Sequence, residues 1–241
     1  MDTFSSNITK WYIQNGRKNL PWRKVITPYR IWISEIMLQQ TQVKTVIPFY
    51  KKFIKKYPNL KSISLATEDD ILALWTGLGF YRRAKNIYRT KEIIKKEYKN
   101  KFPSKYEELI SLPGIGRSTA GAIMSIAYKE SYPILDANVK RVISRYKKIN
   151  TNEKGVVKTL WSLSKNLTPE KNIFEYTQGI MDLGATICNI RSPNCLNCPI
   201  NKTCKSAFKN FEIEYKARKE RPKKKIFFTL AHSKKSFLLF K

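Results

Sequence analysis

The chain has 241 residues, and a hydrophobic content of 42% excludes a wholly disordered protein. No apolar run is long enough to cross a bilayer, and the N-terminal stretch MDTFSSNITKWYIQNG lacks the basic and apolar regions of a secretory signal, so neither a membrane protein nor a secreted one is expected. The 47 lysines and arginines outnumber the 18 acids and give a formal net charge of +29, which is typical of a protein that binds nucleic acid. An A+T-rich genome would also encode part of this lysine excess at tolerant surface positions.

Helical periodicity dominates residues 1–208, because apolar residues recur at intervals of three and four. Short breakers such as YPN, TGLGF and LPGIG separate the periodic segments, which predicts an all-α fold built as a compact bundle of short helices. The segments with this pattern are 31–58, 69–75, 82–99, 118–128, 138–148, 156–167 and 172–188.

In the first long segment, IWISEIMLQQTQV, Glu35 is a lone acid among apolar neighbours. Burial there would raise the pKa of the carboxyl group and keep it protonated, which is the state that a general acid requires. The alternative is an acid at the rim of the core that a local hydrogen bond satisfies. Gln39 and Gln40 follow within about one turn, and their carboxamides could pair with the edges of bases.

The stretch LPGIGRSTAG, residues 112–121, places Gly114 and Gly116 just before an apolar helical segment. Glycines permit a tight turn, and backbone amides at such a turn can bind phosphate without reading a base. An ordinary corner between two helices is the alternative. As a whole, the stretch resembles the helix-hairpin-helix of DNA repair proteins.

A second acid, Asp136, precedes the basic helical segment 138–148, where an N-cap is expected. A catalytic role would require Asp136 and Glu35 to share one cleft, as paired carboxyl groups do in glycosidic bond cleavage, and sequence spacing cannot show this. His232 is the only histidine, so catalytic mechanisms or metal sites that require histidine are not favoured.

All four cysteines lie in CNIRSPNCLNCPINKTC, residues 188–204. In a reducing compartment, four thiolates are suited to tetrahedral zinc or to an iron–sulfur cluster, and the residues alone leave both open. Beyond them, residues 214–225 are charged without an apolar face and read as a linker or a DNA-facing tail. Residues 226–241 read as two short strands around a turn.

Taken together, these stretches resemble the MutY-type adenine DNA glycosylases of the helix-hairpin-helix superfamily. The matching residues are LPWR, TPYRIWISEIMLQQTQV, LWTGLGFYRRAKN, LPGIGRSTAGAI, ILDANVKRV, MDLGATIC and the pattern C-x6-C-x2-C-x5-C, which together cover residues 10–208 in family order. The resemblance implies two helical subdomains that flank a cleft. A six-helix module would occupy 23–131, an iron–sulfur subdomain 1–22 with 132–208, a basic linker 209–225, and the start or remnant of a β domain 226–241.

The implied activity is excision of adenine mispaired with 8-oxoguanine or guanine in double-stranded DNA. By resemblance, Glu35 protonates the base, Asp136 stabilises the cationic sugar, and Asn138 is a further active-site polar residue. The resemblance also assigns base and lesion recognition to Arg23, Gln39, Gln40, Phe80 and Ser118, phosphate binding to Gly114, Gly116, Arg191, Lys202 and Lys205, and a [4Fe–4S] cluster to Cys188, Cys195, Cys198 and Cys204. We expect a monomer that acts in the cytoplasm at the nucleoid.

Several positions depart from the family pattern. Phe80 replaces a tyrosine and Ala137 a glycine, and most of the β-rich domain that recognises 8-oxoguanine has no counterpart here. Ser118 stands where endonuclease III-like enzymes carry a lysine nucleophile, so a monofunctional glycosylase is expected. An endonuclease III-like enzyme, a thymine-mismatch glycosylase and a non-catalytic DNA-binding relative are the alternatives.

Overall fold

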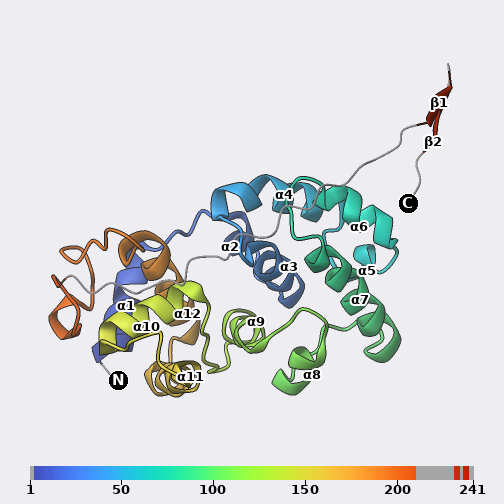
Figure 1. Ribbon diagram of the computed structural model, residues 1–241. Helices are drawn as coiled ribbons and strands as arrows, with labels where there is room; N and C mark the ends of the chain where they lie inside the picture. Colours follow the sequence, from blue (N-terminus) through green and yellow to red (C-terminus); the bar gives the residue numbers. More distant parts are fainter. Residues whose placement is uncertain (1–2, 210–230, 234–235, 239–241) are drawn as a thin grey trace.

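The computed structural model describes residues 3–209, 231–233 and 236–238, and the described part is almost entirely helical (Figure 1). This confirms the expected helical fold. The α-helices are α1 (Thr3–Asn15), α2 (Pro21–Lys24), α3 (Pro28–Leu38), α4 (Val43–Lys56), α5 (Leu60–Ile63), α6 (Glu68–Trp75), α7 (Arg82–Glu97), α8 (Tyr106–Ser111), α9 (Arg117–Ile123), α10 (Ala137–Lys147), α11 (Val156–Leu167) and α12 (Ile173–Asp182). Two π-helical turns, η1 (Met124–Tyr128) and η2 (Leu183–Ile187), continue α9 and α12, and η3 (Asn201–Thr203) is a 3-10 turn.

Near the C-terminus, β1 (Ala231–Ser233) pairs antiparallel with β2 (Ser236–Leu238), with Ala231 opposite Leu238. The expected linker over 209–225 lies outside the described residues except for Lys209. No helix in the described ranges is long and apolar enough to cross a membrane.

The N-terminal helix packs far from its sequence neighbours. Helix α1 lies beside α12, in a group with α10 and α11 at one end of the molecule (Figure 1). Phe4 and Ile8 are fully buried there, and the Phe4 ring lies 4.4 Å from the ring of Tyr146 in α10. Gly179 permits this approach, because a Cβ atom at that position would lie 2.9 Å from Cγ2 of Ile8.

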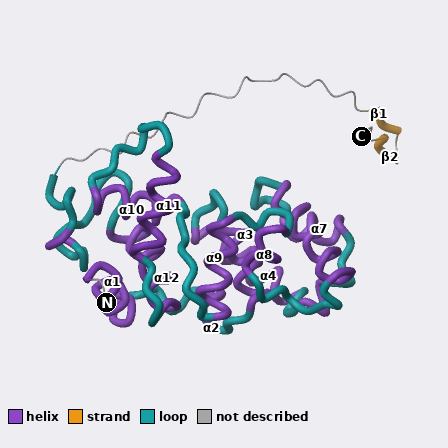
Figure 2. The backbone as a smooth tube through the Cα atoms, turned by 90° about the horizontal axis from the view of Figure 1, so that it is seen from below, coloured by secondary structure: helices purple, strands orange, loops and turns teal. Residues whose placement is uncertain are grey.

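The other end of the molecule is built around α3. Thr27 caps α3 by accepting a hydrogen bond from the amide of Arg30, and Pro28 occupies the first turn, where its missing N–H costs nothing. Trp32 and Ile36 are buried, and α3 packs against α4, α7 and α9, so this helix forms the centre of the core. Both views place α9 between α3 and the group of α10, α11 and α12 (Figure 2).

The periodic segment 31–58 is divided into two helices, since α3 ends at Leu38 and α4 begins at Val43. Gln40, between them, adopts a left-handed conformation with φ of 56°. The periodicity does not predict this break, because glutamine is a good helix former and apolar residues continue on both sides.

Candidate active site and cysteine pocket

Glu35 lies on α3 between the buried residues Ser34 and Ile36 but keeps part of its own surface exposed. Burial, and to a lesser extent the charge of Asp136, raise the pKa of the Glu35 carboxyl group to about 7 against the opposing charge of Arg23. Because Asp136 acts on this pKa, the two carboxyl groups lie close enough to interact. Sequence spacing alone does not reveal this interaction.

Asp136 caps α10, as expected, by accepting a hydrogen bond of 2.8 Å from the amide of Val139. The backbone and side chain of Asn138 also donate to its carboxylate. Burial nevertheless holds the pKa of Asp136 above its ordinary value, against these hydrogen bonds and the charge of Arg141. The residue that caps α10 therefore also has a partly exposed carboxyl group, and its charge acts on Glu35.

Asn138 is held by Arg141 from the next turn of α10. Nη2 of Arg141 donates to Oδ1 of Asn138 at 2.8 Å and to the carbonyl of Gly184 at 2.5 Å, and Nε donates to the carbonyl of Cys188 at 2.7 Å. Gly184 has room for no side chain, because a Cβ atom there would lie 2.7 Å from Cβ of Asn138. The start of α10 is therefore joined to the segment that carries the first cysteine.

Arg23 points its guanidinium at Asp182, a fully buried acid at the end of α12. Nη1 and Nη2 of Arg23 donate to the two carboxylate oxygens of Asp182 at 2.7 and 3.0 Å, and Arg17 adds a contact of 2.6 Å. Burial alone would raise the pKa of Asp182, but hydrogen bonds and charge from Arg23 and Arg17 hold it below its ordinary value. Arg23 is thus a fixed cation near Glu35, and a contact of Arg23 with the base stays a prediction.

The other expected recognition residues of this region separate into two kinds. Nε2 of Gln39 donates to the carbonyl of Gly114 at 3.2 Å, so this side chain joins α3 to the hairpin turn. Gln40 and Phe80 are exposed and have φ values of 56° and 51°, which are unusual for residues other than glycine.

The hairpin turn connects α8 to α9 at the expected residues. Gly114 has φ of 82°, and a Cβ atom there would lie 2.8 Å from Nδ2 of Asn86, so this position requires glycine. Gly116 is exposed with φ of −88° and directly precedes α9. Oγ of Ser118 accepts a hydrogen bond of 3.0 Å from the amide of Leu135, which ties the hairpin helix to the segment that leads to Asp136.

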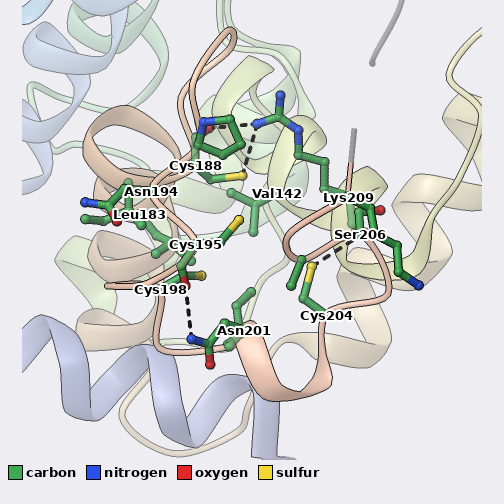
Figure 3. A pocket seen from close by; sticks show the side chains of 15 residues that line it. Val142, Leu183, Cys188, Asn194, Cys195, Cys198, Asn201, Cys204, Ser206 and Lys209 are labelled. Atoms are coloured by element: carbon green, nitrogen blue, oxygen red, sulfur yellow. Dashed lines mark hydrogen bonds between the residues drawn. The ribbon is translucent and has the colours of Figure 1, made fainter. Parts of the chain in front are cut away.

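The four cysteines line one pocket, and Figure 3 shows their side chains around a common hollow. All four are free thiols, and burial raises the pKa of Cys198 to about 12 and that of Cys204 in the same direction. Arg145 donates to Sγ of Cys188 at 3.4 Å. Within the described ranges, no group of three or more histidine, cysteine or acidic side chains has the arrangement of a metal site.

The donor set of this pocket nevertheless fits a metal group held by sulfur. Neither histidine nor carboxylate is among the residues that line it, and its cavity of about 40 Å³ exceeds the space for one water molecule. Four thiolates favour zinc or an iron–sulfur cluster over hard cations. Three basic residues with exposed side chains lie on this segment, namely Arg191, Lys202 and Lys205.

The buried charged residues that were not expected from the sequence include Arg83 in α7, Arg141 in α10 and Asp182 in α12. Asp182 carries the same signal as Glu35, since it is a lone acid within the apolar run IMDLG. The two arginines lie in basic helical segments, where no pattern separates a buried arginine from an exposed one.

Comparison with known proteins defines the class. Residues 33–166 match the HhH-GPD superfamily of base excision DNA repair proteins, and the chain belongs to this family. It is 50% identical to the adenine DNA glycosylase of Buchnera aphidicola subsp. Schizaphis graminum, over 90% of this chain and 63% of that protein. It is 48% identical to the adenine DNA glycosylase of Buchnera aphidicola subsp. Baizongia pistaciae, over 99% of this chain and 69% of that protein.

Solved structures agree with this assignment. A thermostable thymine-DNA glycosylase superposes with a TM-score of 0.75 at 31% identity, over 84% of this chain and 94% of that chain. The chain thus spans nearly the whole of that structure, but only about 63% of the first Buchnera relative.

Proposed function

We propose that the chain is a monofunctional DNA glycosylase that hydrolyses the N-glycosidic bond of adenine mispaired with 8-oxoguanine or guanine in double-stranded DNA. The observation that carries this proposal is the carboxyl pair, in which Glu35 has a pKa of about 7 and interacts with Asp136. Such a pair provides one acid that holds its proton near neutral pH and a second that is available to oppose positive charge. Relatives at about half identity are adenine DNA glycosylases, which favours adenine as the base.

The reaction begins with an adenine flipped out of the duplex toward Glu35. The protonated Glu35 donates its proton to the base, the C1′–N9 bond breaks, and its electron pair leaves with adenine. The resulting oxocarbenium ion is opposed by the carboxylate of Asp136, which Asn138 and the amide of Val139 hold in place. Water then adds to C1′ and gives its proton to Glu35, which restores the acid.

The residues at the hairpin favour hydrolysis over lyase chemistry. A β-lyase needs an amine that forms a Schiff base with C1′, whereas Ser118 has a hydroxyl group already engaged with Leu135. We propose that amides near Gly114 and Gly116 contact phosphate, that Gln40 and Phe80 enter the base stack, and that Arg23 and Gln39 border the base pocket. The partner is accordingly double-stranded chromosomal DNA, bound by a monomer.

We further propose that Cys188, Cys195, Cys198 and Cys204 hold a [4Fe–4S] cluster. The cluster would order the segment 188–204, so that Arg191, Lys202 and Lys205 meet DNA phosphates. In this division of the chain, residues 1–22 and 132–208 form the cluster subdomain, 23–131 the six-helix module, 209–225 a basic linker, and 226–241 part of a β domain.

The metal content tests this proposal independently of activity. Protein purified without air is expected to contain iron and to absorb visible light, and the variant Cys198→Ala is expected to lose both. A colourless protein that contains zinc would refute the cluster.

An excision assay tests the activity. We expect the protein to excise adenine opposite 8-oxoguanine or guanine, so that later treatment with alkali breaks the strand at each abasic site. Asp136→Asn should slow this reaction by roughly a hundredfold, because the cationic sugar loses its counter-charge. Excision of thymine opposite guanine alone would favour the thymine-mismatch alternative, and efficient trapping by borohydride would favour the endonuclease III-like one.

A further inference from the structure

Arg83, in the first turn of α7, is only 7% exposed and binds two separate segments of the chain. Its guanidinium contacts no carboxylate in any described hydrogen bond or ion pair. It donates instead to five oxygen atoms, namely the carbonyls of Ile36 (3.0 Å), Met37 (2.7 Å), Gln39 (2.6 Å) and Gly79 (3.2 Å) and Oγ1 of Thr41 (3.0 Å).

Three of these acceptors are the carbonyls that end α3, the helix that bears Glu35. The last carbonyls of a helix carry partial negative charge and lack partners within the helix, so a buried cation can be stabilised there without an acid. Burial still lowers the pKa of Arg83 to about 10, which leaves the group charged at neutral pH. The guanidinium also lies 5.4 Å from the ring of Trp75 and 5.2 Å from that of Phe80.

Each of the two bound segments leads directly into an exposed residue in a left-handed conformation. The carbonyl of Gln39 precedes Gln40, and the carbonyl of Gly79 precedes Phe80, which is 44% exposed. Left-handed backbone costs on the order of 1 kcal/mol for residues other than glycine and persists only where the surroundings fix it. One guanidinium therefore fixes the peptide groups before both residues.

From this geometry we propose that Arg83 is a positioning residue, which holds Gln40 and Phe80 as a preformed pair that enters the DNA base stack and sets this pair against the end of the Glu35 helix. This inference rests on the proposed function, because it concerns the step that extrudes the base. Its chemical basis is specific to arginine, since a lysine ammonium cannot reach five acceptors in two segments.

The test compares Arg83→Lys with Arg82→Lys, a matched change at the exposed neighbouring arginine. Single-turnover excision is measured for an adenine opposite 8-oxoguanine in a duplex without unpaired bases, called here the paired duplex, and for the same adenine in an unpaired bulge, whose base needs no help to leave the stack. Arg83→Lys should slow excision from the paired duplex by roughly tenfold to a hundredfold and from the bulge by less than about threefold. Arg82→Lys should change neither rate by more than about threefold.

Equal losses on both substrates, or no loss on either, would overturn the proposal. Should Arg83→Lys be poorly folded, Phe80→Ala is the second variant, because its side chain is exposed, and it should show the same preference for the bulge. If Arg83 acts through Phe80, the loss of excision rate in the double variant Arg83→Lys with Phe80→Ala should be smaller than the two single losses combined.

Fluorescence of 2-aminopurine in place of the adenine separates this inference from the proposed function. Flipping raises this fluorescence whether or not the base is cut. Arg83→Lys should reduce the rise in a paired duplex even if no adenine excision is found, whereas an unchanged rise would reject the role of Arg83.

Discussion

Among single residues, Glu35 shows how position converts an ordinary acid into one that holds its proton near neutral pH. Its carboxyl group has a pKa of about 7, because burial and the charge of Asp136 both disfavour ionisation. The proton-donating form is therefore abundant below about pH 7 and scarce above it.

This acidity gives a pH profile for excision. The single-turnover rate should fall by roughly tenfold per pH unit above about pH 7, since the protonated fraction of Glu35 falls in that proportion. Measurement of the rate in a series of buffers checks this. A rate that stays level from about pH 7 to 9, or rises, would show that Glu35 does not act as the acid.

Asp182 provides a stability prediction at the same scale. Asp182→Asn removes the only carboxylate that faces the buried side chain of Arg23 in the described ion pairs, and should destabilise the fold by about 3–5 kcal/mol in denaturant unfolding. Arg17→Met is the milder control, because the Arg17 side chain is 29% exposed and water can replace part of its contact. A loss below about 1 kcal/mol for Asp182→Asn would contradict this account of the cluster.

At the residue scale, the sequence predicts a functional residue only where its neighbours along the chain make that residue unusual. Glu35 and Asp136 could be singled out, one as a lone acid in an apolar segment and the other before a basic helix. Their proximity could not, because it depends on how α3 meets the start of α10. Arg83 was equally hidden, since four of its five acceptors lie 42 to 47 residues away in the chain.

At the scale of elements, apolar periodicity predicts the helices well but misses the turn at residues 39–42. That turn depends on a left-handed Gln40 and on the contacts of Arg83, neither of which leaves a local signal. The hairpin turn, in contrast, is visible in sequence because Gly114 needs its positive φ.

The two hairpin glycines should respond differently to the same change. Gly114→Ala should destabilise the fold by more than about 1 kcal/mol, since its Cβ atom would meet Asn86 at an unfavourable φ. Gly116→Ala should be tolerated, because nothing lies within 4 Å of its Cβ position and its φ is ordinary. Thermal unfolding of both variants checks this, and equal effects would contradict the described turn.

For the whole molecule, a net charge of +29 predicts that binding to DNA depends steeply on salt. If about six phosphates are neutralised, the affinity should fall by roughly a thousandfold between about 50 and 200 mM salt. Titration of a labelled duplex at several salt concentrations measures the slope. A slope near zero would mean that the charge is not directed at DNA.

The central claim is that Glu35 drives the release of adenine from a mispair. The most direct measurement is the free adenine released from a duplex with adenine opposite 8-oxoguanine, under single-turnover conditions, by the natural chain and by Glu35→Gln. We predict release by the natural chain and a rate at least about a hundredfold lower for Glu35→Gln, because glutamine has no proton to give. No adenine from the natural chain, or equal rates from both, would contradict the account.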